Sequence, residues 1–236
     1  MKNLFLACKI VLIQFFLLNF TMAKSQKITG YINQLGFVDL GLPSGILWAT
    51  CNVGAKTPFE LGNLYAWGET QPKNFYSWSN YKWASNYVHD KWGRPCDFTK
   101  YCSDIKYGII DNKSILDLID DAAFVNCGES WRMPTYDELR ELYSNCNWEI
   151  LEKTDSTSVA GCIGISKHNN NSIFFPCDDL DNDVYFYFWS SSLSIDNTNC
   201  GSCVYFGENE FVWLRQFRNQ GFPVRAVVRE YRYIKD

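Results

Sequence analysis

The stretch Trp-Arg-Met-Pro-Thr-Tyr-Asp-Glu-Leu, residues 131–139, indicates more about the fold of this chain than any other segment. Pro134 sets a rigid turn after the arginine, and Thr135 with Glu138 matches the Thr-x-x-Glu pattern of a helix capping box. In that motif the hydroxyl and the carboxylate each accept a hydrogen bond from a backbone amide that the helix leaves unpaired. The stretch therefore predicts a helix that starts after Thr135, and it identifies no chemistry.

Helices are predicted twice in the middle of the chain. The second follows Pro134, where Leu139 and Leu142 fall on one face. The first covers residues 115–125, where apolar residues recur at three- and four-residue intervals, as they do on one face of a helix. These residues are Ile115, Leu118, Ile119 and Ala122.

Short strands are predicted on both sides of these helices. Residues 37–53 form two strands around the turn-rich Gly41-Leu42-Pro43-Ser44-Gly45, and another strand covers residues 63–69. Residues 71–111 read as a loop-like insert whose many aromatic side chains indicate that it packs. In the last third, strands are predicted at 172–175, 185–190, 203–206, 210–214 and 224–229, with Glu208-Asn209 at a hairpin tip. Two helices within a strand-and-loop chain predict an α+β domain.

The first 23 residues have the pattern of a cleaved secretory signal. Lys2 precedes a long apolar stretch, and small residues up to Ala23 follow it. Lys9 divides the apolar stretch and leaves too few residues for a membrane-spanning helix, which needs about 20. We therefore expect an exported chain, in the periplasm, at the cell surface or secreted, with no stable membrane span after cleavage. Residues 24–36 are then a linker or an edge segment, and residues 37–232 form one domain.

The charge of the chain argues against a nucleic-acid partner. The formal net charge is −4 at pH 7, and it becomes −6 when the signal takes Lys2 and Lys9 with it. No basic stripe remains on which a polyanion would bind.

Cysteines are numerous for an exported chain. Nine of the ten remain after the signal is removed, and disulfides are their default state outside the cell. An odd count leaves at least one thiol unpaired in a monomer. Spacing alone does not fix the pairing, and the candidates closest in sequence are Cys96 with Cys102 and Cys200 with Cys203.

Six blocks of the sequence carry a resemblance to a known family. They are Val38–Ala55, Tyr65–Thr70, Asp120–Ala123, Ser130–Thr135, Phe188–Ser192 and Gly221–Arg225. Together, and in this order, they resemble the Fibrobacter succinogenes major paralogous domain family over nearly all of residues 37–229. That family occurs in exported proteins of Bacteroidetes-type bacteria, and its biochemical role is largely unassigned.

A more distant similarity concerns the Arg-Met-Pro-Thr-x-x-Glu pattern at residues 132–138, which Gly221-Phe222-x-Val224 follows near the C-terminus. The pattern is similar to that of formylglycine-generating, sulfatase-modifying proteins. The resemblance implies their C-type-lectin-like fold, a single α+β domain of short irregular antiparallel strands with two central helices. Because that fold hosts enzymes, glycan binders and protein receptors alike, it does not decide the function. Within it we expect structural roles for Trp131, Arg132, Pro134, Thr135, Glu138 and Trp189.

Thiol chemistry has one candidate. Formylglycine-generating enzymes use a redox-active cysteine pair, and Cys200-Gly201-Ser202-Cys203 lies in a comparable region of this chain. A redox thiolate needs a nearby cation or helix N-terminus, whereas Asp196 and Glu208 flank this pair. We therefore expect inert thiols or a structural disulfide, and no catalytic residue.

Metal binding also has little support in the sequence. The acidic run at residues 178–183 presents carboxylates at alternate positions, but the helix-loop-helix calcium pattern fails at Val184 and Ser190. Calcium is therefore only a minor candidate cofactor. His89 and His168 lack partners at ligand spacing, so we expect no zinc site.

The strongest binding candidate is the aromatic-rich segment at residues 205–218. Alternate residues of a strand point the same way, so Phe211, Trp213 and Arg215 should share one face while Val212 and Leu214 share the other. An exposed face that combines Trp with Arg suits stacking on sugars or docking of a protein. The candidate ligand-binding residues are Tyr205, Asn209, Phe211, Trp213, Arg215 and Arg218.

The sequence thus predicts an exported, non-catalytic module that binds a glycan or a protein at the cell surface through its C-terminal hairpins. One alternative is a sulfatase-modifying-type enzyme that uses Cys200 and Cys203. Another is a structural surface protein whose partners are copies of itself. The three predict ligand binding, thiol chemistry and concentration-dependent assembly, respectively.

Overall fold

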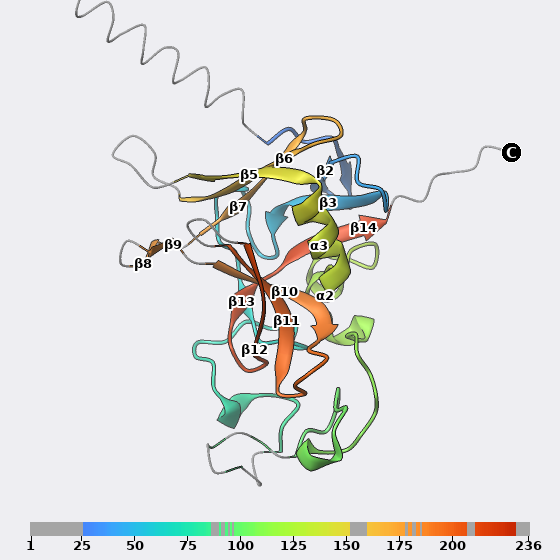
Figure 1. Ribbon diagram of the computed structural model, residues 1–236, viewed down its shortest axis with the longest axis vertical. Helices are drawn as coiled ribbons and strands as arrows, with labels where there is room; N and C mark the ends of the chain where they lie inside the picture. The colour runs from blue at the N-terminus through green and yellow to red at the C-terminus, as the bar shows by residue number, and fades with distance from the viewer. Residues whose placement is uncertain are drawn as a thin grey trace, which may run out of the picture.

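The computed structural model describes residues 26–85, 90, 93, 95, 97–151, 160–177, 179–180, 183–184, 186–206 and 211–229. In this part of the chain, antiparallel strands dominate and two α-helices accompany them (Figure 1). The predicted α+β class is therefore confirmed. No helix within the described residues is long and apolar enough to cross a membrane. The predicted signal, residues 1–23, lies outside the described residues.

The elements follow one another in this order. The N-terminal half contains β1 (Gly30–Ile32), β2 (Leu35–Asp39), β3 (Ile46–Asn52), β4 (Leu64–Tyr65), the 3-10 helices η1 (Trp78–Asn80), η2 (Ile105–Tyr107) and η3 (Leu118–Asp120), and α2 (Ala122–Cys127). The C-terminal half contains α3 (Tyr136–Ser144), β5 (Cys146–Leu151), β6 (Gly161–Ser166), β7 (Ser172–Pro176), β8 (Asp179–Leu180), β9 (Asp183–Val184), β10 (Phe186–Leu193), β11 (Cys200–Phe206), β12 (Phe211–Phe217), β13 (Phe222–Pro223) and β14 (Arg225–Arg229). The five strands predicted in the last third are thus confirmed, with ends shifted by at most three residues.

The strands form several small sheets. The orders are β1-β2-β3-β14, β5-β6-β7 and β10-β11-β12, with the pairs β4-β13 and β8-β9 in addition. β3 lies between β2 and β14 and is buried along its whole length. Helix α3 contacts β5 on one side and β10 and β11 on the other, so it joins two of the sheets (Figure 1).

The capping box of the opening stretch is present at the start of α3. The Thr135 hydroxyl oxygen accepts from the Glu138 amide at 3.2 Å, and the Glu138 carboxylate accepts from the Thr135 amide at 2.9 Å. Arg132 holds the same carboxylate with two nitrogens, at 2.6 and 2.7 Å. Although burial raises the pKa of Glu138, these hydrogen bonds outweigh it and lower the pKa. The predicted capping box is therefore present, and Arg132 adds an ion pair to it.

The residues around the capping box fasten α3 to its neighbours. Arg132 exchanges two backbone hydrogen bonds with Val227 of β14, at 2.8 and 3.0 Å. The Pro134 carbonyl accepts from the Ser191 amide of β10 at 2.8 Å. Trp131 is fully buried, as is Trp189, whose indole donates to the Tyr65 carbonyl at 2.8 Å. The stretch therefore joins β14, β10 and α3 into one packed unit.

The first predicted helix is wrong in its extent. The chain forms the short η3 and then α2, which starts only after Asp121, because the Asp121 carboxylate caps the amides of Ala123 and Phe124. The residues before it, 114–116, instead run along β10, with the Leu116 amide donating to the Ser191 carbonyl at 3.0 Å. As a consequence, three residues of the periodic pattern are about half exposed or more: Ile115 at 50%, Leu118 at 49% and Ile119 at 72%.

The described part of the insert at residues 71–111 packs through its aromatic side chains, as predicted. Tyr81, Phe98 and Tyr101 are buried, and Phe98 forms a cluster with Trp78 and Tyr81. Asp120 anchors the insert from the other side. Its buried carboxylate accepts from Lys82 at 3.0 Å, Lys100 at 2.5 Å and the Tyr101 hydroxyl at 2.8 Å.

The strands β5 and β6 were not predicted, and in β6 two glycines interrupt the pattern of a strand. In β6, the rings of Phe174 and Trp148 lie over Gly161 and Gly164, and a Cβ atom would approach those rings within 2.3 and 2.7 Å. The close approach explains why glycine occupies both positions. β5 pairs with β6 directly after α3.

Candidate functional site

An open groove lies at one end of the β10-β11-β12 sheet. Its volume is about 920 Å³. Ser202 of β11 and Arg215 of β12 line it, and they stand directly opposite each other in the β11-β12 ladder. Side chains opposite each other across two strands point to the same face, so this face of the hairpin forms one wall of the groove.

The other walls come from distant parts of the chain. β10 has a register shift between Trp189 and Leu193, and its outer edge carries residues 114–116. The Leu193 amide donates to the Ser114 carbonyl at 2.8 Å. The Tyr136 amide, at the start of α3, donates to the Ser192 hydroxyl at 3.1 Å. These hydrogen bonds bring Ser114, Tyr136 and Ser192 together around the groove.

Opposite charges balance each other at the groove. The Arg215 guanidinium lies 3.0 Å from the Asp196 carboxylate, and both side chains are at least half exposed. Lys113 pairs with Asp117 at 2.5 Å. The hydrogen bonds from Lys100 and Lys113 lower the pKa of Asp117. Because each cation has a carboxylate partner, the groove favours a ligand without a large net charge.

Exposed aliphatic side chains stand at the rim. Ile195, beside Asp196, is 94% exposed, and Ile115 is 50% exposed. Single exposed isoleucines are common on proteins, but two at one groove provide apolar contact area for a ligand.

The structure brings only part of the predicted binding segment to this groove. Arg215 lines it, whereas Tyr205 lies towards the other end of β11, with its ring centroid 5.1 Å from that of Tyr187. Asn209 lies outside the described residues, and Phe211 and Trp213 are described only as backbone positions of β12.

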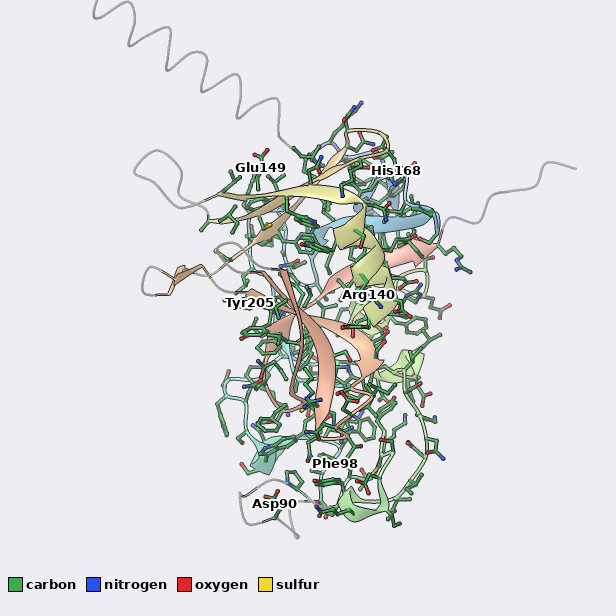
Figure 2. All side chains as sticks on the ribbon, viewed as in Figure 1. Asp90, Phe98, Arg140, Glu149, His168 and Tyr205 are labelled. Carbon is green, nitrogen blue, oxygen red and sulfur yellow. The ribbon has the colours of Figure 1, made fainter. Side chains whose placement is uncertain are left out.

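Arg218 corrects the sequence-based prediction. It is fully buried, so it is not on an exposed ligand-binding face. Its guanidinium carbon lies 3.8 Å from the ring centroid of Phe98, and one nitrogen donates to the Tyr101 carbonyl at 3.0 Å. Burial lowers its pKa. Figure 2 shows Phe98, on which Arg218 packs, at the opposite end of the sheet from Tyr205. Arg218 and Tyr205 therefore lie in different parts of the molecule and do not form one binding surface.

The structure also corrects one of the two disulfide candidates, Cys200 with Cys203. No disulfide joins any two of the described cysteines. Cys200 and Cys203 are three residues apart on β11, which separates their Cα atoms by about 10 Å, while a disulfide allows at most about 7 Å. Cys102 is a buried thiol 3.2 Å from the Asp104 carbonyl oxygen, and Cys96 lies outside the described residues.

The same geometry bears on thiol chemistry. Burial raises the pKa of the Cys203 thiol, whereas a nucleophilic cysteine needs a lowered one. A pair held on one extended strand cannot alternate between dithiol and disulfide without a break in the β11 ladder.

Metal ligands do not gather in the described part of the chain, where no group of three or more His, Cys, Asp or Glu side chains could hold an ion. The predicted acidic run is only partly described. Asp179 and Asp183 belong to the short pair β8-β9, and residues 178, 181 and 182 lie outside the described residues.

Several groove residues had no signal in the sequence. Asp196 precedes β11 by a few residues, yet nothing local indicates that it reaches Arg215 on β12. Tyr136 and Asp137 also line the groove, but they lie in the first turn of α3, and the capping box there predicts only where the helix begins. Only the contacts across β10 and the hairpin bring them to one place.

The fold and this groove define a class of protein: an α+β domain of small antiparallel sheets with an open, charge-balanced groove on one of them. Comparisons with protein-family models, curated proteins and solved structures find no match to this chain.

Proposed function

We propose that this chain is an exported, non-catalytic binding module with a C-type-lectin-like fold, and that it binds a glycan or a polypeptide at the bacterial surface. The groove beside Arg215 is the observation that carries the proposal. Its volume of about 920 Å³ falls in the range typical of ligand sites, about 300–1,000 Å³. Its walls combine hydroxyl groups, one accessible charge pair and exposed aliphatic side chains.

A glycan is the first ligand class that these groups fit. Arg215 presents several N–H donors and Asp196 presents carboxylate acceptors, so neighbouring sugar hydroxyls find both kinds of partner at one point. Tyr136 adds an aromatic ring on the opposite wall, against which a sugar face can stack. The balanced charge suits a neutral saccharide.

A polypeptide is the second ligand class, and the rim favours it. Ile195 and Ile115 expose apolar surface that a sugar contacts poorly and an apolar peptide side chain contacts well. The groove also adjoins β12, whose backbone is a natural partner for an extended peptide.

The proposed family and fold have support in where the resembling residues lie. Trp131 and Trp189 are fully buried, and Arg225 is buried with hydrogen bonds to Asn52 and to the carbonyls of Ala49, Thr50 and Phe174. Residues that encode a fold are expected in such positions, and residues that encode a binding activity are not. The resembling residues therefore support the proposed architecture, and the argument about the ligand rests on the groove alone.

The test is a binding screen of the exported chain on glycan arrays and peptide libraries, followed by affinity measurements with variants. Arg215→Ala should weaken binding of the ligand found by about tenfold or more, because it removes the donors and leaves Asp196 unpaired. Arg229→Ala is the matched control, since Arg229 is an exposed arginine at the end of β14 in another sheet. Equal affinity of the Arg215→Ala and wild-type chains would refute the site.

A further inference from the structure

Arg218 is a fully buried cation that the proposed binding function does not use. It directly follows β12, and its guanidinium carbon lies 3.8 Å from the ring centroid of Phe98. One nitrogen, Nη1, donates to the carbonyls of Lys100 and Tyr101 at 3.3 and 3.0 Å. The other two nitrogens, Nε and Nη2, are buried and have no hydrogen-bond partner in the described part of the chain. Buried charged groups are rarely left so incompletely paired, so these two N–H groups need an explanation.

Arg225 shows how this chain satisfies a buried guanidinium with its own atoms. Its Nε donates to Asn52 Oδ1 at 2.7 Å, and Nη1 and Nη2 donate to three backbone carbonyls at 2.9 to 3.1 Å. All three nitrogens of Arg225 therefore have a partner, and each of these partners is a neutral oxygen. By this comparison, Arg218 lacks an acceptor for the N–H groups of Nε and Nη2.

An acceptor without a donor lies close to these donors. The Arg218 amide donates to the Asn199 carbonyl at 3.0 Å, which extends the β11-β12 ladder by one pair beyond Cys200 and Phe217. Residues opposite each other in an antiparallel ladder have their side chains on the same face, with Cβ atoms about 4.5–5.5 Å apart. Asn199 Oδ1 is buried and has no donor among the described residues, so neither Nε nor Nη2 reaches it directly. The NH₂ group of the same amide donates to Asn197 Oδ1 at 3.1 Å, which fixes the orientation of the amide.

We propose that a buried water molecule lies between Arg218 and Asn199, where it accepts from the guanidinium and donates to Asn199 Oδ1. Water is the ligand that fits, because it both accepts and donates, and buried waters make about three hydrogen bonds to groups that otherwise have no partner. Asn219 Oδ1 and Gln220 Oε1 are also buried without a donor in the described chain. They belong to the turn that contains Arg218, so they offer acceptors for the second hydrogen of the water.

A small anion fits this place less well than water. An anion accepts from the guanidinium but cannot donate to Asn199 Oδ1, whose lone pairs repel it. The positive charge of Arg218 also has compensation from aromatic rings. The ring centroids of Phe98, Tyr81 and Trp67 lie 3.8, 5.5 and 5.6 Å from its guanidinium carbon. The site therefore needs a neutral hydrogen-bonding bridge more than it needs a counter-ion.

The water completes a joint between two parts of the fold. Through Nη1, Arg218 holds the insert by the carbonyls of Lys100 and Tyr101, and through the water it also holds the Asn199 side chain at the start of β11. Neither Arg218 nor Asn199 lines the groove, so this inference does not rest on the proposed function.

The first test is a crystal structure of the chain grown in sodium bromide, with anomalous data collected at the bromine absorption edge. We expect a peak of ordinary density without anomalous signal, within about 2.7–3.2 Å of Asn199 Oδ1 and of Arg218 Nε or Nη2. An anomalous peak at this place identifies an anion and overturns the proposal. A direct contact between the two side chains with no density between them overturns it as well.

The second test needs no crystal and uses cross-relaxation between water and the Nε–H groups in NMR spectra of the ¹⁵N-labelled chain. The Nε–H signal of Arg218, assigned through its side-chain couplings, should show a cross-peak to water. Arg225 is the internal control and should show none, because its Nε–H donates directly to Asn52 Oδ1. Asn199→Leu should abolish the Arg218 cross-peak, because it removes the acceptor. A wild-type chain without this cross-peak, or an unchanged cross-peak in the folded Asn199→Leu variant, overturns the proposal.

Discussion

Asp121→Ala should be among the most destabilising single substitutions outside the large aromatic core residues. The Asp121 carboxylate is 2% exposed, and one oxygen accepts from the amides of Ala123 and Phe124 at 2.8 and 3.0 Å. The other oxygen accepts from the Met133 amide at 2.8 Å, which ties α2 to the stretch before α3. Loss of a helix cap costs about 0.5–2 kcal/mol, and a buried amide left unpaired costs about 1–3 kcal/mol.

The expected loss of unfolding free energy is therefore about 2–4 kcal/mol. For a domain of about 200 residues, a loss of about 3 kcal/mol lowers the melting temperature by about 6–12 °C. Asp121→Asn keeps one oxygen for the α2 cap but turns its NH₂ group towards the Met133 amide, so its loss should be intermediate.

Calorimetry and urea unfolding at pH 7 measure both quantities. The matched control is Asp137→Ala, which also removes an aspartate from the first turn of a helix, but one whose side chain is 89% exposed. Its melting temperature should stay close to that of the wild type. A loss below about 1 kcal/mol for Asp121→Ala would refute the view that one buried carboxylate joins α2 to the α3 stretch.

Three further outcomes are expected. Burial raises the pKa of Asp120, but the hydrogen bonds from Lys100, Tyr101 and Lys82 outweigh it and lower the pKa. The ionised carboxylate therefore stabilises the fold above about pH 4, and this stabilisation is lost as the pH falls. Asp120→Asn should make the melting temperature depend less on pH in this acidic range. Arg218→Ala should lower the melting temperature yet leave ligand affinity unchanged, because Arg218 packs on Phe98 and does not reach the groove; weaker binding by the folded variant would contradict this. Chelation of divalent cations should change neither the melting temperature nor binding at the groove, and a calcium-dependent affinity would point to the acidic run at residues 178–183.

Local signals in the sequence predicted local structure. Thr135 and Glu138 are three residues apart, and the capping box they form needs nothing beyond those residues. The periodic pattern of Ile115, Leu118 and Ile119 failed because a stronger local signal competed with it. Asp121 caps the N-terminus of α2, so that helix begins after Asp121 and cannot extend back to Ile115.

The candidate site was beyond local signals for a different reason. Arg215 was identified as a binding candidate, but its partner Asp196 lies 19 residues earlier, across a hairpin. Arg218 was a second candidate in the same segment, although it lies three residues after Arg215 and just beyond the end of β12, so alternation along the strand does not place it on the face of Arg215. The difference between them comes from Phe98, about 120 residues upstream, which covers the guanidinium of Arg218. Burial is set by such tertiary contacts, and alternation along one strand does not contain them.

The opening stretch turns out to be part of the site's construction as well as of the fold. The Pro134 carbonyl, just before α3, accepts a hydrogen bond from the Ser191 amide of β10. The amide of Tyr136, the first residue of α3, donates to the Ser192 hydroxyl at 3.1 Å, and Tyr136 lines the groove. The position of Tyr136 therefore depends on where α3 begins, and the capping box fixes that point. Thr135→Ala should for this reason act twice, because it lowers stability by about 1 kcal/mol and also loosens the wall that Tyr136 supplies. A Thr135→Ala chain that loses stability but keeps full affinity would separate the two roles and would place the ligand on the hairpin wall alone.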